Sequence, residues 1–374
     1  MSFDAEVKGL EELGCEVVKS TYNSAEIAGS RKLTVSISQL WSCAAARKLR
    51  SDIQEHRPDI IHVHNIFPQI SRSCYWVAHK LSVPIVQTLH NYRPICAGGL
   101  LALNGEPCNK CLNSSWQYPA IVNRCYRNNY LTSIPLVLSN QFHHQIGTNR
   151  LSNVWYTTAS DFTKNKYVEA GWDASRIIVK PNLIDVPEFS SITKDIRSGV
   201  IYVGRLSEEK GIRELLIAWS KYKGNEQLTV IGNGPLIEDV VSASKIDQRI
   251  RYLGELPIEE VFNHMACSKA LVQPSVCYET FGRTLAEALA VGTPIITSKG
   301  GALAEIAQRS SGYQVDPKRP DELVSAISEV TNLSNSSMNE LSFKAKKVFE
   351  EYFSYSKVNQ SLLSLYREIL EINK

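Results

Sequence analysis

Short apolar stretches alternate along the chain with longer amphipathic segments. Nine of these stretches have the length and the β-branched content of buried strands: PDIIHVHN, VPIVQTLHN, VWYTTAS, RIIVKPN, GVIYVGR, QLTVIGNG, IRYLGEL, KALVQPS and TPIITS. The segments between them are long enough to form helices. Strands that alternate with helices form parallel sheets, so the pattern predicts an α/β protein with Rossmann-like layers.

One segment interrupts this alternation near the middle of the chain. Residues 185–199, DVPEFSSITKDIRSG, combine a proline with a run of polar residues, which is typical of a linker between domains. We therefore expect an N-terminal domain over residues 1–185 and a C-terminal domain over residues 186–354, with a cleft between them. Sheets of this kind bind ligands beyond the carboxyl ends of their strands, so loops of both domains would form one site.

The stretch QPSVCYETFGRTLAEALAVGTPIITS, residues 273–298, carries the strongest candidate chemistry. A predicted strand leads to Glu279, a turn follows at Gly282, and then a small-residue helix contains Glu287. The first turn of such a helix has unpaired amide N–H groups and a positive dipole charge, which suits a phosphate. Glu287 can accept hydrogen bonds from the vicinal hydroxyls of a ribose, and Glu279 from those of a further sugar. The predicted binding residues of the turn are Phe281, Gly282, Arg283, Thr284 and Leu285.

Two cations follow the predicted strand of GVIYVGRLSEEKGI. Arg205 stands at the carboxyl end of this strand, and Lys210 at the start of the next helix. Such a pair can bind a diphosphate and neutralise it as a leaving group. Alone, the pair would be more typical of a solvated surface; together with the two glutamates it indicates a diphosphate site.

Histidines end two strands of the first domain. His90 closes VPIVQTLH, where a side chain at the carboxyl end can face a ligand. His62 and His64 alternate along HVHN and should therefore point to opposite faces of the strand. We expect one of them in the core, and His64 in the site.

Four cysteines gather in the loop that follows His90 and shortly after it. A Cys-x2-Cys pair could close a tetrahedral, structural zinc site with two further thiols; a reduced, buried cluster is an equally good interpretation. The four residues are Cys96, Cys108, Cys111 and Cys125.

Composition and charge narrow the class of protein. The chain has 374 residues, enough for two cores, and its 43% hydrophobic and 21% charged residues are typical of a soluble protein. No apolar run reaches the roughly 18 residues of a membrane-spanning helix, and no secretory signal follows Met1. With nine cysteines and no signal, we expect reduced thiols and a cytoplasmic location.

The net charge of +3 conceals a basic first half. Residues 27–160 contain 13 Lys and Arg against 4 Asp and Glu. This surplus suits a pyrophosphate-bearing acceptor or peripheral association with the inner face of a membrane, and no nucleic-acid partner is predicted. A basic face without any partner is an equally good interpretation.

The motif PS-x3-E-x-FG-x4-EA-x3-G-x-P resembles the donor-site signature of the retaining glycosyltransferases of family 4, which have the GT-B fold. GR-x4-KG is similar to the family's phosphate-binding pair, and the T-x-H element at His90 to one that holds a functional histidine. The resemblance implies that the main chain near Leu256 lies against the nucleobase. It also implies that the last helix, within residues 355–374, crosses back onto the first domain, and that no catalytic metal is required.

The resemblance further implies the activity. A hexose-type sugar would pass, with retention of configuration, from a nucleotide-diphosphate donor to a glycan or polyprenyl-linked acceptor, in surface polysaccharide or lipopolysaccharide assembly. Catalysis would rest on positioning and on stabilising the departing diphosphate. The residues expected to carry it are His90, Arg205, Lys210 and Glu279. Two alternatives stay open: a GT-B-like sugar-nucleotide epimerase, and a catalytically impaired protein that binds nucleotides or glycans.

The first residues depart from the family pattern. Family members begin with a strand and a glycine-rich loop, followed by a helix. Here Met1 starts within that helix, and LGCEVVKS is expected to form the second strand, with Cys15 where histidine is usual. A start codon assigned too late is the favoured explanation, ahead of a degenerate reading frame or a protein that adapts to the loss.

Overall fold

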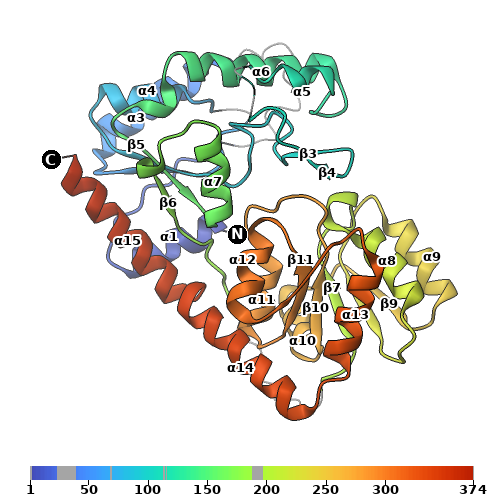
Figure 1. Ribbon diagram of the computed structural model, residues 1–374. Helices are drawn as coiled ribbons and strands as arrows, with labels where there is room; N and C mark the ends of the chain where they lie inside the picture. The colour runs from blue at the N-terminus through green and yellow to red at the C-terminus, as the bar shows by residue number, and fades with distance from the viewer. Residues whose placement is uncertain are drawn as a thin grey trace. The chain divides into compact units, whose positions relative to one another are not determined.

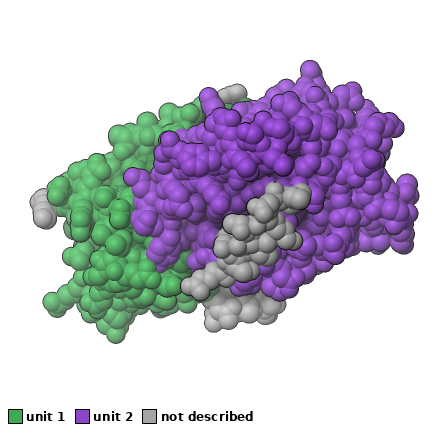
Figure 2. All heavy atoms as spheres, turned by 90° about the horizontal axis from the view of Figure 1, so that it is seen from below, with its two compact units in different colours: residues 1–103, 108–181, 359–374 green, residues 104–107, 182–358 purple. Residues whose placement is uncertain are grey.

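The computed structural model describes residues 2–22, 39–67, 70–112, 114, 116–187 and 197–373. The chain forms two compact units, which are coloured separately in Figure 2. Unit 1 comprises residues 1–103, 108–181 and 359–374, and unit 2 comprises residues 104–107 and 182–358. The central part of the predicted linker, residues 188–196, lies outside the described residues.

Unit 1 is built on a parallel four-stranded sheet in the order β1-β2-β5-β6; Figure 1 labels its strands β5 and β6. Its strands are β1 (Ile61–Val63), β2 (Ile85–Thr88), β5 (Val154–Thr158) and β6 (Ile177–Val179). Its helices are α1 (Ser2–Glu12), α3 (Cys43–His56), α4 (Ser73–Lys80), α5 (Tyr118–Val122), α6 (Tyr130–Gln145), α7 (Asp161–Glu169) and most of α15 (Tyr355–Ile372). Val86 and Trp155 are register partners on one face of the sheet, where they pack with Leu10 of α1 and with Tyr366 and Ile369 of α15.

The expected strand LGCEVVKS is wrong. Residues 15–20 pair with no strand in the described part of the chain. Cys15 and Val17 instead pack beside the apolar cluster of Leu10 and Tyr366. Two of its apolar side chains thus contact the core, whereas Leu13 and Val18 are exposed, and the backbone pairs with no described neighbour in a ladder.

Unit 2 contains a parallel six-stranded sheet in the order β12-β11-β10-β7-β8-β9. Its strands are β7 (Val200–Val203), β8 (Leu228–Ile231), β9 (Ile250–Gly254), β10 (Ala270–Gln273), β11 (Ile295–Ser298) and β12 (Tyr313–Val315). Its helices are η4 (Glu208–Lys210), α8 (Ile212–Lys221), α9 (Ile237–Ile246), α10 (Ile258–Ala266), α11 (Arg283–Ala290), α12 (Gly301–Ser310), α13 (Pro320–Thr331) and α14 (Asn335–Tyr352). The strand order reverses between β7 and β10, and in such sheets ligands bind at this point.

Most of the strands and the last helix lie where the sequence pattern predicts them. The nine apolar stretches with the character of buried strands all contain strands, and the four- and six-stranded sheets are parallel as expected. β12 and the short two-stranded sheet of β3 (Ala102–Leu103) and β4 (Glu106–Pro107) were not predicted. The predicted C-terminal helix is α15, whose residues from Asn359 onward belong to unit 1. None of the described helices is long and apolar enough to cross a membrane.

Candidate functional site

The loops that follow β7 and β10 meet where the strand order of unit 2 reverses. Because these two strands are neighbours, their carboxyl ends bring Lys210 and Glu279 together. The Lys210 Nζ lies 2.5 Å from Glu279 Oε1, which also accepts a hydrogen bond from the Ser275 hydroxyl at 3.0 Å. Arg205 is exposed after β7, and its carbonyl accepts a hydrogen bond from Tyr202. The structure therefore joins the predicted cation and carboxylate directly, and leaves the second cation in solvent.

Glycine holds the two loops in close contact. Gly211 has φ of +73°, and a Cβ atom there would lie 1.9 Å from the carbonyl oxygen of Pro274. Gly282 has φ of +149°, and a Cβ would lie 2.6 Å from a methyl group of Leu303. Gly211 therefore allows the loop after β7 to approach the loop after β10, and Gly282 allows the start of α11 to approach α12.

Gly282 is the N-cap of α11, and no described side chain caps this helix. The first intrahelical bond runs from the Ala286 amide to the Gly282 carbonyl, so the amides of residues 283–285 precede the helical ladder. The Phe281 ring is only 6% exposed and packs against Phe353 with centroids 5.8 Å apart. The turn thus presents main-chain amides, and the Phe281 side chain anchors it to the core.

Glu287 lies on α11 with an exposed fraction of 6%. Arg283 Nε donates to its Oε1 at 2.7 Å. Burial raises the pKa of Glu287, and the hydrogen bond and charge of Arg283 oppose this shift. Arg283, predicted as a phosphate-binding residue, therefore also holds the carboxylate in place.

The loops after β8 and β9 are bonded to each other and to the loop after β7. The Gly232 amide donates to the Gly254 carbonyl at 2.7 Å, and a Cβ on Gly232 would lie 1.9 Å from the Gly204 carbonyl. Leu256, predicted to lie near a nucleobase, is half-buried in the loop after β9. Close approach of main chain to main chain therefore explains the glycine at position 232.

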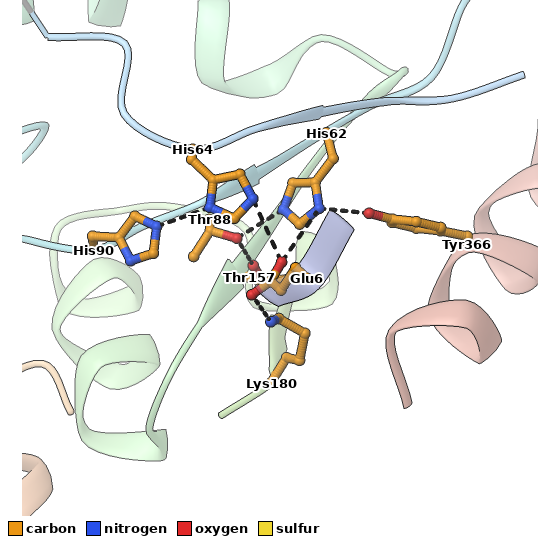
Figure 3. A network of polar contacts seen from close by, with 8 residues as sticks. All are labelled: Glu6, His62, His64, Thr88, His90, Thr157, Lys180 and Tyr366. Atoms are coloured by element: carbon orange, nitrogen blue, oxygen red, sulfur yellow. Dashed lines mark hydrogen bonds and ion pairs between the residues drawn. The ribbon is translucent and has the colours of Figure 1, made fainter. Parts of the chain in front are cut away.

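Unit 1 contains a network of three histidines around a buried ion pair (Figure 3). His62 Nε2 lies 2.8 Å from the Thr88 hydroxyl, and its Nδ1 lies 2.5 Å from the Tyr366 hydroxyl. His64 Nδ1 lies 3.1 Å from His90 Nε2. Burial lowers the pKa of all three imidazoles, that of His90 to about 4, so the rings are neutral at neutral pH.

The prediction that His62 and His64 point to opposite faces is wrong. Their rings stack with centroids 4.5 Å apart. The reason is that β1 ends at Val63, so the alternation of an extended strand does not reach position 64. His64 lines a pocket beside His90, whereas His62 is hydrogen-bonded within the core.

The ion pair at the centre of this network was not predicted. Lys180 Nζ donates to Glu6 Oε1 at 2.7 Å, and the two residues are 1% and 2% exposed. Glu6 Oε2 lies 3.4 Å from His64 Nε2 and 4.0 Å from His62 Nδ1. No local motif indicates this pair, because 174 positions separate the lysine from the glutamate.

Three residues of this network are also of the types that bind metal ions. In the described part of the chain, Glu6, His62 and His64 are the group of three whose ligand atoms all lie within 4.8 Å of one another. The Lys180 ammonium already balances the carboxylate, and both nitrogens of His62 lie within hydrogen-bond distance of hydroxyls. These contacts indicate a hydrogen-bonded ion pair rather than a metal centre.

The four cysteines lie near one another in unit 1. Burial raises the pKa of Cys111 to about 12, and Cys96, Cys125 and Cys108 raise it further. Sulfurs bound to one tetrahedral zinc ion are about 3.8 Å apart. Among the described residues, no three of these sulfurs come within 4.8 Å of one another, so a shared ion would require the loop to tighten. Structural zinc stays a prediction.

A pocket of about 660 Å³, part of it open to solvent, lies beside His64 and His90 at the carboxyl ends of β1 and β2. All the residues that line it belong to unit 1. The sequence indicated the two histidines but not the arginines that face them, Arg72 and Arg93.

Two family models match the chain. The model described as Glycosyltransferase Family 4 matches residues 7–188, and the model described as Glycosyl transferases group 1 matches residues 197–332. The first therefore covers most of unit 1, and the second most of unit 2.

Curated relatives align over part of their length. An uncharacterized glycosyltransferase of Methanocaldococcus jannaschii is 30% identical over 186 residues, which are 48% of this chain and 47% of the relative. Glycogen synthase of Mycobacterium tuberculosis is 26% identical over 295 residues, 76% of this chain and 62% of that enzyme. The chain thus spans about half to three fifths of the length of these relatives.

Solved structures share the fold. HepE from Anabaena, in complex with UDP, has a TM-score of 0.61 and 17% identity, with 86% of this chain and 82% of that chain covered. A glycosyltransferase from Rickettsia africae has a TM-score of 0.63 and 16% identity, with 98% of this chain and 88% of that chain covered. At these identities the similarity establishes the fold.

Proposed function

This chain belongs to the family 4 glycosyltransferases of the GT-B fold, and from this membership we propose that it transfers a hexose-type sugar from a nucleotide-diphosphate donor with retention of anomeric configuration. The acceptor is a glycan or a lipid-linked glycan of a surface polysaccharide. The observation that carries the proposal is the contact of Lys210 with Glu279 beside the uncapped start of α11. The structures of HepE with UDP and with UDP-glucose support a nucleotide sugar as donor.

Each group in unit 2 has a definite part in this proposal. The amides of residues 283–285 and the side chain of Lys210 bind the pyrophosphate, and Arg205 folds over it from solvent. Glu279 orients Lys210 and accepts hydrogen bonds from the transferred sugar. Glu287 binds the ribose. As the glycosidic bond breaks, negative charge develops on the departing phosphate, where the cation and the helix start stabilise it.

The acceptor hydroxyl needs no covalent intermediate on the protein. It attacks the anomeric carbon from the face that the diphosphate leaves, and its proton passes to the departing phosphate. His90 of unit 1 contributes a neutral imidazole that can hydrogen-bond a sugar hydroxyl, since burial lowers its pKa to about 4. Catalysis in this scheme rests on positioning and electrostatic stabilisation.

A panel of nucleotide sugars tests the proposal. The wild-type chain should transfer sugar from one of them to a glycan acceptor, or hydrolyse it slowly when no acceptor is present. Lys210→Gln and Glu279→Gln should each reduce turnover by about 100-fold or more, the usual effect of removing a group that stabilises the transition state. Lys221→Gln is the matched control, because Lys221 forms an exposed pair with Asp321 in the same unit. Unchanged turnover in both site variants would contradict the proposal, as would a rearranged nucleotide sugar as product.

A further inference from the structure

The pocket of unit 1 is cationic and contains no counter-charge. Seventeen residues line it, and they include two arginines, two histidines and several amides, but no aspartate or glutamate. The carboxylate that lies closest to these histidines is Glu6, which is buried behind His64 and paired with Lys180. Among the described residues that line the pocket, no carboxylate balances the charges of the two arginines.

Arg72 precedes α4 and is half-buried. Its Nη2 donates to Asn140 Oδ1 at 2.7 Å, and it forms no ion pair with a carboxylate in the described part of the chain. The charge of Arg72 opposes protonation of buried His143, as its effect on the pKa of that imidazole indicates. A guanidinium has five N–H donors, and within the described part of the chain the hydrogen bond of Arg72 to Asn140 uses one of them.

Arg93 lies in the loop after β2 and stacks on two aromatic rings. Its guanidinium carbon is 4.2 Å from the centre of the Phe67 ring and 5.2 Å from that of Tyr126. Its Nη1 donates to the Ala97 carbonyl at 3.3 Å, and its buried Nε has no hydrogen-bond partner among the residues that the structure describes. Burial lowers the pKa of Arg93, which is the expected effect of holding a cation out of water.

Asn140 connects the two arginines. Its Oδ1 accepts from Arg72, and its Nδ2 donates to the backbone carbonyl of Arg93 at 2.8 Å. A second bond, from Nδ2 to Gln117, fixes the amide further. Both cations are thus positioned around one side chain of α6, in the same pocket as His64 and His90.

We propose that this pocket binds an acceptor whose sugar is linked to a phosphate or diphosphate, with the anionic group on Arg72 and Arg93 and the sugar hydroxyls toward His64 and His90. The inference rests on the proposed function and names its acceptor class. A partly buried cation without a partner is unfavourable, and a bound phosphate removes this cost through bidentate hydrogen bonds from the guanidinium groups. The neutral imidazoles suit hydroxyl groups rather than the phosphate.

Calorimetric titration with inorganic pyrophosphate tests the anion site. The titration uses the full chain with Lys210→Gln, which removes the cation that contacts Glu279 in the donor site of unit 2. Adding Arg72→Gln or Arg93→Gln should weaken pyrophosphate binding by about tenfold or more, because hydrogen bonds to charged groups are lost. Arg47→Gln, on the exposed side of α3, should leave binding unchanged.

Conservative variants keep the test valid if a glutamine variant unfolds. Arg72→Lys and Arg93→Lys retain the charge and lose the bidentate geometry, so they should bind pyrophosphate with intermediate affinity. Equal affinity in all the variants would overturn the proposal, and so would the absence of any binding to the Lys210→Gln chain.

Transfer assays separate the two sources of the phosphate. One arm offers a water-soluble sugar 1-phosphate, and the other a polyprenyl diphosphate glycoside in phospholipid vesicles. The proposal is supported if the wild type transfers sugar to one of these acceptors in preference to an uncharged methyl glycoside, and if Arg72→Gln loses this preference. The preferred acceptor then identifies the source of the phosphate. Equal transfer to the methyl glycoside overturns it. If no nucleotide sugar is turned over but pyrophosphate still binds in an arginine-dependent way, the proposed function fails and the anion site stands.

Discussion

Replacement of Lys180 by methionine tests the buried ion pair of unit 1. Lys180 Nζ lies 2.7 Å from Glu6 Oε1, and the two residues are 1% and 2% exposed. Methionine has a similar length and no charge, so the carboxylate would stay in the core without its cation. Removing one partner of a buried pair costs about 3–5 kcal/mol. Lys180→Met should therefore lower the free energy of unfolding of unit 1 by about this amount at neutral pH.

The size of this loss should depend on pH, because His62 and His64 face the same carboxylate. Burial holds the pKa of both imidazoles below the unfolded value of about 6.5, and Lys180 lowers them further. In the wild type, the unfolded chain therefore binds more protons than the folded chain once the pH falls below about 6.5. The free energy of unfolding then decreases by up to about 1.4 kcal/mol per pH unit for each histidine.

The variant should respond differently to acid. Without Lys180, an imidazolium at His64 can pair with Glu6, so the pKa of His64 rises toward its unfolded value. The variant then loses less stability than the wild type as the pH falls. The difference in unfolding free energy between the two proteins should accordingly shrink between about pH 7.5 and about pH 5.5.

Tryptophan fluorescence during denaturant unfolding provides the assay. Five of the six tryptophans belong to unit 1, so the signal reports mainly on that unit: Trp41, Trp76, Trp116, Trp155 and Trp172. Lys80→Met, at an exposed position of α4, is the matched control. The double variant Glu6→Gln/Lys180→Met should recover part of the loss. Equal unfolding free energies for wild type and Lys180→Met, or a difference that does not change with pH, would refute this reasoning.

Three further outcomes are expected. Glu287→Gln, which keeps the contact with Arg283 but removes the charge, should raise the KM for the nucleotide sugar by about tenfold with little change in kcat, since charged hydrogen bonds to the ribose are lost; an unchanged KM would contradict the assignment. Gly211→Ala should lower the thermal midpoint clearly more than Gly147→Ala, because both have φ near +72° but only the first would place a Cβ against the Pro274 carbonyl. Metal analysis of the purified protein should find about one zinc per chain if the four cysteines bind it, and a content far below that would remove the zinc prediction.

Local pattern predicted nine strands of this protein, missed β3, β4 and β12, and wrongly indicated a strand at LGCEVVKS. The nine strands follow from short β-branched stretches, and the start of α11 follows from the glycine turn at Gly282. Lys210 and Glu279 could be assigned to one site because each stands just past the end of a predicted strand, and the carboxyl ends of parallel strands share one edge of a sheet. These predictions succeed because each depends on the hydrophobic period of one strand or helix and on the spacing of residues in the loop that follows it.

Interactions between distant segments were decided only by the tertiary structure. The pairing of Glu6 with Lys180 and the placement of Arg72 and Arg93 in one pocket depend on which elements pack together. The stacking of His62 on His64 depends on where β1 ends, which alternation alone could not locate. Charge and burial at these positions result from contacts across the whole of unit 1, and no short stretch of sequence contains that information.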